Sequence, residues 1–578
     1  MTEPDSQLLS ELLAFIRDEQ RAGNRKLLEV WDRPLQEKLD KGLSQGFTRL
    51  ERADEPSALW AYLDTSESRF REGDLLLLHS GNPLTSQLGQ GLSLEAEEDD
   101  RWLLSGKRAL AALGAYAGGP CYADPDGIDL TPYYERSLEE IGKSQIGLRV
   151  VLPLLGGRCD ITFDDRDVSE GERVALAEGF NPKQAEAVGL AFGAEQVACI
   201  QGPPGTGKTR VLSLIVRLMV ERGERVLMTS HTHMAINNAL NKIHAQGVPT
   251  IKVGRDTQRK GLDDSIECHP NLGAWDARPT NGYVVGATPF ATCTSRLESY
   301  EFDTVIFDEA SQITVPLALM AMRKGRRFIF IGDQKQLPPV MLSRSVLAKD
   351  SLSVFAALTA QDADHTTMLS ETYRMNRPLT AWPSRMYYGS QLVSAGANRE
   401  RRFTLSKVPD RLAAVFDPSA SGVFVPTLDR SARTQNFRDA ELVAELCAAA
   451  VDGGLPLDHI GVVTPYRSQG RAVRNLLCYR FGRVAAQKVV ADTVERMQGQ
   501  ERELIILSLA TGDEVFLEAV APFFFQPERL NVSITRPISK LIVIGPELAA
   551  VPDLEDDTVK QWIAQYRDLI GHLKKVDL

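Results

Sequence analysis

One short run constrains the fold of this chain more than any other feature of its sequence. It fits the pattern GxxxxGK[ST] at every fixed position and lies between the strand-like segment 197–200 and the helical segment 211–218. In that setting the glycines let the backbone wrap an anion, so that amide N–H groups and the helix N-terminus face a phosphate. The run consists of Gly202, Pro203, Pro204, Gly205, Thr206, Gly207, Lys208 and Thr209. The sequence therefore predicts a nucleotide-phosphate loop.

Two side chains of this loop and two acidic residues downstream have the chemistry of nucleotide hydrolysis. Lys208 is expected to reach the β- and γ-phosphates of ATP, and the Thr209 hydroxyl is expected to ligate Mg2+. Asp308 directly follows the apolar run 304–307, which suits a magnesium ligand beside the loop. Glu309 is placed to orient or deprotonate the attacking water. We therefore expect an ATP hydrolase that uses magnesium.

Apolar strand-like runs alternate with helical runs through most of the remaining chain. Strands that alternate with helices predict a parallel sheet that is covered on both faces. The first series comprises 197–200, 226–228, 283–285, 304–307 and 328–331, and the second comprises 460–463, 503–509 and 540–544. Two series predict two tandem α/β sheet domains, which we place at residues 175–345 and 346–578.

The N-terminal part of the chain has a different pattern of apolar and turn-forming residues. Residues 1–56 carry Leu8 and further apolar residues at three- and four-residue spacing, which predicts N-terminal helices. From 57 to 165, short apolar runs such as 74–78 and 147–155 lie between glycine, proline and aspartate clusters. Short apolar runs separated by turn-forming residues favour a small β-rich accessory domain.

Composition excludes several classes of protein. Charged residues make up 25% and hydrophobic residues 43% of the chain, which is ordinary for a globular protein. The seven cysteines form no CxxC pair, which argues against a zinc ribbon and favours reduced thiols. The sequence has neither a signal-peptide pattern nor a membrane-length apolar run, so we expect a cytoplasmic protein without a membrane partner. Because the net charge is −11, any nucleic-acid partner must bind a local basic groove.

Six further sequence blocks follow in a fixed order around the phosphate loop. They are 181–184 (NPKQ), 332–339 (GDQKQLPP), 371–376 (ETYRMN), 462–469 (VVTPYRSQ), 493–501 (TVERMQGQE) and 529–536 (RLNVSITR). Over residues 180–545 the chain resembles a superfamily 1B helicase of the Upf-like group, which includes the nonsense-mediated-decay helicase. The resemblance implies two RecA-like domains, with a stalk helix and a small barrel over the nucleic-acid channel.

The resemblance also implies roles around the nucleotide. Arg374 and Arg536 are similar to two arginines that reach the γ-phosphate from the second domain. Such cations would stabilise the charge that spreads over the transferred phosphoryl group. The remaining implied roles are Gln184 and Tyr373 at the adenine, Glu501 at the ribose, Gln336 as a γ-phosphate sensor and Gly499 beside the same phosphate. Pro537 departs from the group's pattern, but proline is tolerated in a first helical turn.

Contacts to nucleic acid are implied at loop tips after several strands. Hydroxyls and backbone N–H groups at such tips suit phosphate contacts that carry no sequence information. The positions that match the family are Ser230, His231, Thr288, Thr464, Tyr466 and Thr493. Phe290 and Tyr466 are equally suited to stacking on bases and to packing in the core. His231 and His233 depart from the family's pattern in their loop.

These patterns lead to one principal hypothesis and two alternatives. The first is a monomeric ATP-driven motor that moves 5′ to 3′ along single-stranded DNA or RNA and unwinds duplexes, with the direction taken from the resemblance. The second is an ATP-gated clamp or remodeller that binds single strands without processive unwinding. The third is an ATPase that acts on protein or small molecules, against which the blocks at Thr464 and Thr493 argue. The sequence does not choose between DNA and RNA, because it shows no 2′-hydroxyl contact.

Overall fold

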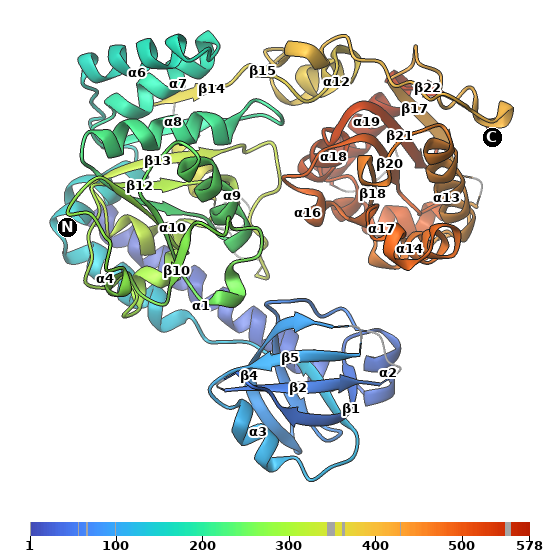
Figure 1. Cartoon of the computed structure of the whole chain (residues 1–578), viewed down its shortest axis with the longest axis horizontal. Coiled ribbons are helices and arrows are strands. Elements are labelled where there is room, and N and C mark those ends of the chain that lie inside the picture. The colour runs from blue at the N-terminus through green and yellow to red at the C-terminus, as the bar shows by residue number, and fades with distance from the viewer. Residues whose placement is uncertain are drawn as a thin grey trace.

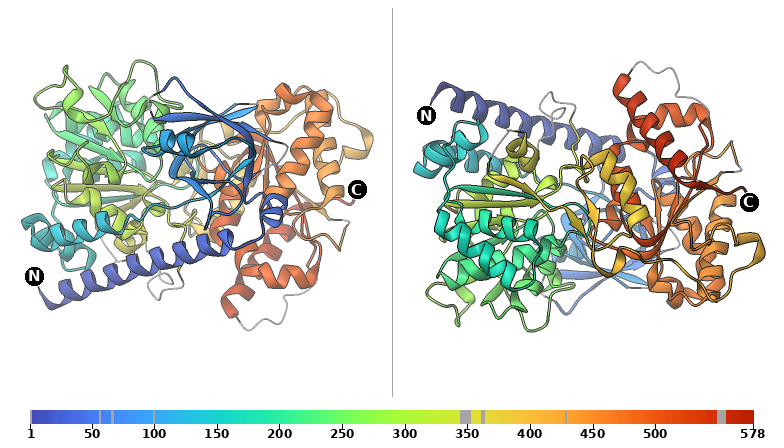
Figure 2. Two further views of the ribbon diagram at one scale, coloured as in Figure 1. Left: turned by 90° about the horizontal axis from the view of Figure 1, so that it is seen from below. Right: turned by 90° about the horizontal axis from the view of Figure 1, so that it is seen from above.

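The structure is a computed structural model, and it describes residues 2–55, 57–64, 68–98, 100–343, 353–360, 364–427, 429–548 and 556–578. Figure 1 shows two α/β bodies side by side, with a small barrel beneath them. A long N-terminal helix runs from the first body to the barrel, as both views of Figure 2 show. The predicted fold class is confirmed, because two parallel sheets accompany an N-terminal helix and a β-rich domain.

The N-terminal helix α1 (Glu3–Trp31) anchors the barrel to the first sheet domain. Thr2 and Asp5 form a capping box at its start, which satisfies backbone N–H groups that a helix leaves free. Its apolar stripe includes Leu12, Phe15 and Ile16, which are buried in the same core as the first sheet. Because the apolar stripe of α1 packs in the core of the first sheet domain, the helix connects that domain to the barrel.

The barrel is closed, with the strand order β1-β2-β5-β4-β3-β6. Its strands are β1 (Gln45–Arg52), β2 (Ala58–Leu63), β3 (Leu75–His79), β4 (Gln87–Glu97), β5 (Arg101–Ser105) and β6 (Cys121–Pro125). Short helices α2 (Leu35–Asp40) and α3 (Ala109–Ala115) accompany it. Phe47 and Trp102 meet edge to face inside, among buried leucines. Closure leaves no free sheet edge.

Two predictions for this region are wrong. The apolar run 147–155 is helical, forming a π-helix (Gly147–Val151) and α5 (Leu152–Leu155), and not a strand of the β-rich domain. A continuous apolar run does not distinguish a buried strand from a buried helix, and here it packs in the core of the first sheet domain. Helix α4 (Thr131–Lys143) lies against that domain too. The first barrel strand also begins at Gln45, inside the segment predicted as helical.

The first sheet has eight parallel strands in the order β10-β9-β11-β8-β12-β13-β7-β14. They are β7 (Val197–Gln201), β8 (Arg225–Thr229), β9 (Thr250–Val253), β10 (Glu267–His269), β11 (Tyr283–Gly286), β12 (Thr304–Phe307), β13 (Arg327–Gly332) and β14 (Thr366–Met368). Alternate side chains of β7 enter two different cores, so both faces are covered. Because β14 pairs with β7, this sheet extends beyond the predicted boundary at residue 345.

The second sheet has the order β19-β18-β20-β21-β17-β22. Its strands are β17 (Gly422–Pro426), β18 (Ile460–Thr464), β19 (Val490–Thr493), β20 (Arg502–Ser508), β21 (Pro537–Gly545) and β22 (Lys574–Lys575). Helices α13 (Phe437–Asp452) and α14 (Arg467–Phe481) cover one face. Helices α12 (Arg377–Tyr387), α17 (Glu514–Phe524), α18 (Pro527–Ile534) and α19 (Asp557–His572) cover the other. Among the described residues, no helix is long and apolar enough to cross a membrane.

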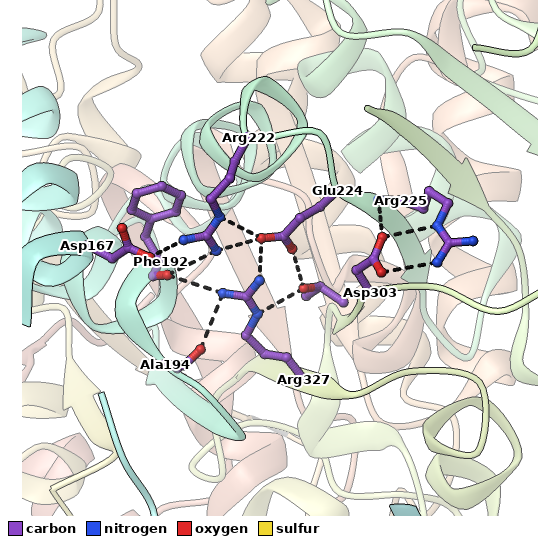
Figure 3. Close-up of polar contacts among 9 residues, drawn as sticks. Asp167, Phe192, Ala194, Arg222, Glu224, Arg225, Asp303 and Arg327 are labelled. Carbon is purple, nitrogen blue, oxygen red and sulfur yellow. Dashed lines mark hydrogen bonds and ion pairs between the residues drawn. The ribbon is translucent and has the colours of Figure 1, made fainter. Parts of the chain in front are cut away.

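An ion-pair network fixes the amino edge of the first sheet (Figure 3). Glu224 contacts both Arg222 and Arg327. Arg327 also donates to the carbonyl oxygens of Phe192 at 3.2 Å and Ala194 at 3.3 Å, at the end of α7 (Pro182–Gly193). Asp167, Arg225, Asp303 and Thr304 complete the network. Because Glu224 is buried between two arginines, its removal would leave both cations without this partner, so the edge opposite the phosphate loop is firmly held.

Candidate nucleotide site and nucleic-acid interface

The phosphate loop connects the end of β7 to α8 (Lys208–Glu221). Gly205 and Gly207 have φ angles of 75° and 82°, in the left-handed region that favours glycine. A Cβ atom on Gly205 would also lie 2.4 Å from the Cβ of Arg374. The loop therefore needs glycine both for its backbone path and for the close contact with the second sheet domain.

Side chains of the first domain support the loop. Lys208 Nζ donates a hydrogen bond to the carbonyl oxygen of Gly202 at 2.6 Å, which holds the ammonium group within the loop. Gln184 Nε2 donates to the carbonyl oxygen of Thr206 at 2.9 Å. Gln184 is itself buried and held by a capping box with Asn181 at the start of α7. The cradle is thus built largely from hydrogen bonds within the first domain.

Asp308 and Glu309 follow β12 at the same edge of the sheet. Burial, and then the neighbouring Glu309 carboxylate, raise the pKa of Asp308 to about 7, against the opposing effect of Lys208. Glu309 has a φ of 51°, and its backbone N–H donates to Asp308 Oδ1 at 3.0 Å. From the second domain, Gln498 Nε2 lies 3.4 Å from Glu309 Oε2. A buried carboxylate of this kind is stabilised in its charged form by a cation.

The donors present fit magnesium better than a closed metal centre. No group of three or more His, Cys, Asp or Glu side chains that could hold a metal occurs in the part of the chain that the structure describes. The Thr209 hydroxyl and the Asp308 carboxylate offer oxygen ligands. Mg2+ typically takes one or two protein oxygens and completes its shell with waters and substrate phosphates.

The second sheet domain supplies two arginines to the opposite wall. Arg374 Nε donates to Glu501 Oε2 at 2.7 Å, and its Nη1 donates to the carbonyl oxygen of Thr535 at 3.1 Å. Arg536 is buried and donates from Nε to the carbonyl oxygen of Val532 at 2.8 Å. Burial, followed by repulsion from Arg374, lowers the pKa of Arg536 to about 9. Arg536 therefore remains charged at neutral pH, and the present partners of both arginines belong to the second domain.

A cavity of about 350 Å³ lies between these two walls. Its lining consists of Pro204, Gly205, Thr206, Gly207, Lys208, Thr209, Arg210, Glu309, Gln336, Tyr373, Arg374, Gly499, Glu501 and Arg536. Of the predicted nucleotide-site residues, only Gln184, Gly202, Pro203 and Asp308 are absent from this lining. Sequence reasoning missed Arg210, whose guanidinium lies 4.0 Å from the centre of the Phe180 ring. Its position directly after Thr209 was the available signal.

The segment around Tyr373 joins the second domain to the phosphate loop. The backbone N–H of Tyr373 donates to the carbonyl oxygen of Gly205 at 2.8 Å. Thr372 Oγ1 donates to the carbonyl oxygen of Pro204 at 2.8 Å. Asn181 Nδ2 donates to the Tyr373 hydroxyl at 2.9 Å. Tyr373 lines the cavity and is 39% exposed as a residue, so its ring is available for stacking.

Gln336 belongs to a buried chain of hydrogen bonds that sequence reasoning missed. Its Nε2 donates to Asp333 Oδ2 at 2.8 Å, and the hydroxyl of Tyr388 donates to the same oxygen at 2.8 Å. Asn531 of α18 donates to the Tyr388 hydroxyl at 2.8 Å and to the carbonyl oxygen of Lys335 at 2.7 Å. Asn531 lies inside the block 529–536, but nothing in the sequence marked Tyr388. The chain links the cavity wall to the second domain.

The predicted nucleic-acid residues lie at the carboxyl ends of neighbouring strands. Ser230 and Thr288 follow β8 and β11, which are paired in parallel. Thr464 and Thr493 are direct partners at the ends of β18 and β19. The side chains of Ser230 and Thr464 are buried, so a phosphate at these tips would meet backbone groups.

The aromatic and histidine positions differ in their surroundings. The Phe290 ring packs edge to face on Tyr134, with ring centres 5.6 Å apart, which favours core packing over stacking on bases. Tyr466 is half-buried, with its ring centre 6.3 Å from that of Phe523. Burial lowers the pKa of His231 and brings that of His233 to about 4, so both rings are neutral at pH 7. Neither histidine therefore supplies a positive charge for phosphate.

Two family models, each described as an AAA domain, match residues 179–386 and 351–547. The chain is 28% identical over 467 residues to the DNA replication ATP-dependent helicase/nuclease DNA2 of Saccharomyces cerevisiae, covering 74% of this chain and 30% of that protein. It is 26% identical over 501 residues to the DNA polymerase alpha-associated DNA helicase A of Schizosaccharomyces pombe, covering 75% and 71%. Each of the two sheet domains thus lies largely within a match to an AAA-domain model, and about three quarters of the chain is similar to these helicases.

The similarity to these helicases has a defined extent. The chain spans 30% of the length of the Saccharomyces relative, so the match concerns only part of that protein. Among solved structures, the arterivirus nonstructural protein 10 (helicase) is 13% identical, with a TM-score of 0.39 and coverage of 92% of this chain and 82% of that one.

Proposed function

We propose that this chain is an ATP-driven motor of the Upf-like group that moves along single-stranded nucleic acid and unwinds duplexes. The observation that carries the proposal is the cavity between the two sheet domains. One wall holds Lys208 and the glycine-rich loop, and the other holds Arg374 and Arg536. Such a site changes its chemistry with the distance between the domains, which is what a nucleotide-driven motor requires.

The first domain, together with Tyr373 and Gln498 of the second, binds the nucleotide and prepares the attack. Backbone N–H groups of the loop and Lys208 hold the phosphates, while Gln184 and Tyr373 hold the base end. Glu309 orients the attacking water and takes its proton, with Gln498 placed to restrain the carboxylate. Thr209 and Asp308 would hold Mg2+, which when bound neutralises charge on the phosphate oxygens.

The second domain completes the site only when it moves toward the nucleotide. Arg374 then releases Glu501 and binds an oxygen of the γ-phosphate. Arg536 likewise releases the carbonyl oxygen of Val532 and binds the γ-phosphate. Preorganised cations at that point stabilise the transition state. The hydrogen bonds from Gln336 through Asp333 and Tyr388 to Asn531 couple the presence of the γ-phosphate to the position of α18. Hydrolysis therefore drives opening and closing of the two domains over the strand.

Single-stranded DNA is the first substrate to test, because both relatives are named as DNA helicases. We retain 5′ to 3′ movement by a cytoplasmic monomer as part of the proposal. The ATP-gated clamp remains the second candidate, since Thr464 and Thr493 would serve it equally well.

ATPase activity should be measured with poly(dT), with poly(U) and without polymer, followed by translocation and strand displacement on tailed duplexes. A motor shows stimulation by a single strand together with movement and unwinding. Stimulation without movement identifies the clamp. An ATPase that responds to neither polymer refutes a nucleic-acid function.

A further inference from the structure

The loop that follows β8 lies directly beside the two acidic residues that follow β12. The two strands pair in parallel, with Thr229 opposite Phe307. The backbone N–H of Asp308 donates to the carbonyl oxygen of Thr229 at 3.0 Å, which continues this pairing past the end of β12. Because paired parallel strands leave a sheet at the same edge, the residues that follow them stay close together. The side chain of His231, two residues after β8, can therefore reach Glu309.

The His231 ring interacts with the turn that carries Glu309. Its side chain shares a hydrogen bond with Gln312, and the Glu309 carboxylate acts on it through its charge. Gln312 ends a short 3-10 helix (Ala310–Gln312) that directly follows Glu309. The backbone N–H of Gln312 donates to the carbonyl oxygen of Glu309 at 2.9 Å. Both partners of the ring thus belong to residues 308–312, which we call the acidic turn.

The acidic turn needs support from outside, because its backbone is strained. Glu309 has a φ of 51°, in the left-handed region that residues other than glycine rarely adopt. A residue keeps such a conformation only where its surroundings fix it. Gln498 lies 3.4 Å from the Glu309 carboxylate, but it belongs to the second domain and depends on how the two domains are placed. His231 belongs to the first domain, so it supports the turn wherever the second domain lies.

The surroundings of His231 suit this support better than they suit phosphate binding. Burial lowers the pKa of the ring, which is therefore neutral at pH 7 and offers no positive charge to a phosphate. The Nδ1 atom is buried and has no hydrogen-bond partner among the described residues. This nitrogen is thus closed to a strand that approaches from solvent.

His233 of the same loop has different neighbours. It is the first residue of α9 (His233–His244), and its charged neighbours are Lys252, Arg255 and Arg296. The two histidines lie two residues apart, yet His231 faces an acidic group and His233 faces basic ones. His233 is therefore a matched control for the loss of one imidazole from this loop.

We propose that His231 is a positioning residue that holds the acidic turn, and with it Glu309, in the orientation needed for hydrolysis. This inference rests on the proposed function, and it assigns His231 to the nucleotide site instead of the strand contact that the family resemblance implies. Because Ser230 directly precedes His231, a strand bound to the backbone at this loop tip would also fix the ring. A strand would in this way stimulate hydrolysis without touching the nucleotide.

The first test compares His231→Ala with the parent and with His233→Ala. ATPase rates are measured against ATP concentration at saturating oligo(dT), and binding of a fluorescent oligo(dT) is measured by anisotropy. A general base contributes about 10²–10⁴ in rate, and we expect loss of its support to lower kcat by about tenfold. KM for ATP and affinity for oligo(dT) should stay near the parental values, and His233→Ala should keep the parental kcat.

Three outcomes would overturn the proposal. The first is a parental kcat in His231→Ala. The second is a fall in oligo(dT) affinity of about fivefold or more, the effect of one lost hydrogen bond, which would assign His231 to the strand. The third is an equal loss of kcat in His233→Ala, which would show that any change in this loop has the same effect. If the parent itself does not hydrolyse ATP, the proposed function fails and not the role of His231 alone.

Further variants separate positioning from packing. His231→Gln can still hydrogen-bond to Gln312 and should recover most of the parental kcat, whereas His231→Phe fills the space without such a group and should be as slow as His231→Ala. Recovery by Phe and not by Gln would indicate packing alone. His231→Ala combined with Gln312→Ala should be no slower than the slower single variant, because both act on the same turn. Additive losses would contradict action through that turn. Circular dichroism and ATP titration show that each variant is folded.

Discussion

The two walls of the nucleotide cavity differ in what their charged groups contact. On the first-domain wall, Lys208 donates a hydrogen bond to Gly202 within the phosphate loop, and Gln184 donates one to Thr206 of the same loop. On the second-domain wall, Arg374 and Arg536 are held by Glu501 and by carbonyl oxygens of their own domain. The first wall is ready to bind, whereas the second must exchange partners before it can act. Binding and catalysis should therefore respond differently to mutation.

The largest effect is expected from Lys208→Ala. This lysine is the cation that the phosphate cradle itself holds, through its hydrogen bond to the carbonyl oxygen of Gly202, so its loss should weaken ATP binding and abolish hydrolysis. Fluorescent nucleotide titration and an ATPase assay measure both quantities. If hydrolysis survived at the parental rate, the first wall would not be the binding wall.

Glu309→Gln should separate binding from turnover. The amide leaves the cradle intact but cannot take a proton, so kcat should fall by about 10²–10⁴ while ATP still binds. Single-turnover kinetics with radiolabelled ATP measures the chemical step. Turnover near the parental rate would assign the base to another residue.

Arg374→Ala and Arg536→Ala test the second wall. Arginine fingers are typically worth 10³–10⁵ in rate, and we expect at least about a tenfold loss of strand-stimulated turnover in each variant. ATP affinity should fall much less, because the loop and Lys208 remain. Circular dichroism checks folding, which matters for the buried Arg536. Normal turnover in both variants would refute the exchange of partners.

Tyr388→Phe tests the buried chain between the walls. It removes one hydroxyl that donates to Asp333 and accepts from Asn531, so both partners lose a hydrogen bond. We expect the stimulation of ATPase by a strand to fall severalfold, while hydrolysis without a strand changes less. Equal loss with and without a strand would indicate a purely structural role.

Glu501→Gln should have the smallest effect. Its carboxylate pairs with Arg374, but the Glu501 side chain is 52% exposed, and such pairs contribute at most about 1 kcal/mol. If Glu501 positions the arginine, kcat should fall by up to about fivefold with KM for ATP nearly unchanged. A rise in KM instead would support the ribose contact that the family resemblance implies.

The sequence predicted correctly the features that depend on neighbouring residues, and it failed where contacts between distant segments decided the structure. The strand–loop–helix at 197–218 could be predicted because the left-handed glycines of the loop, including Gly207 at the start of α8, are set by local sequence. The run 147–155 could not, because its apolar residues suit a strand or a helix equally, and packing against the first sheet domain decided for a helix. Likewise, β14 joined the first sheet through pairing with a distant strand.

The sequence by itself determined the phosphate loop, the alternating strands and the order of the blocks around them. Each of these depends on spacing within a short segment. Only the tertiary structure decided which side chains face each other across domains. Tyr388 meets Asp333 and Asn531, and Arg467 donates to the carbonyl oxygen of Arg69, across separations of 55 to 398 residues. Such contacts arise from the packing of whole domains, because no local pattern encodes which distant surfaces come together.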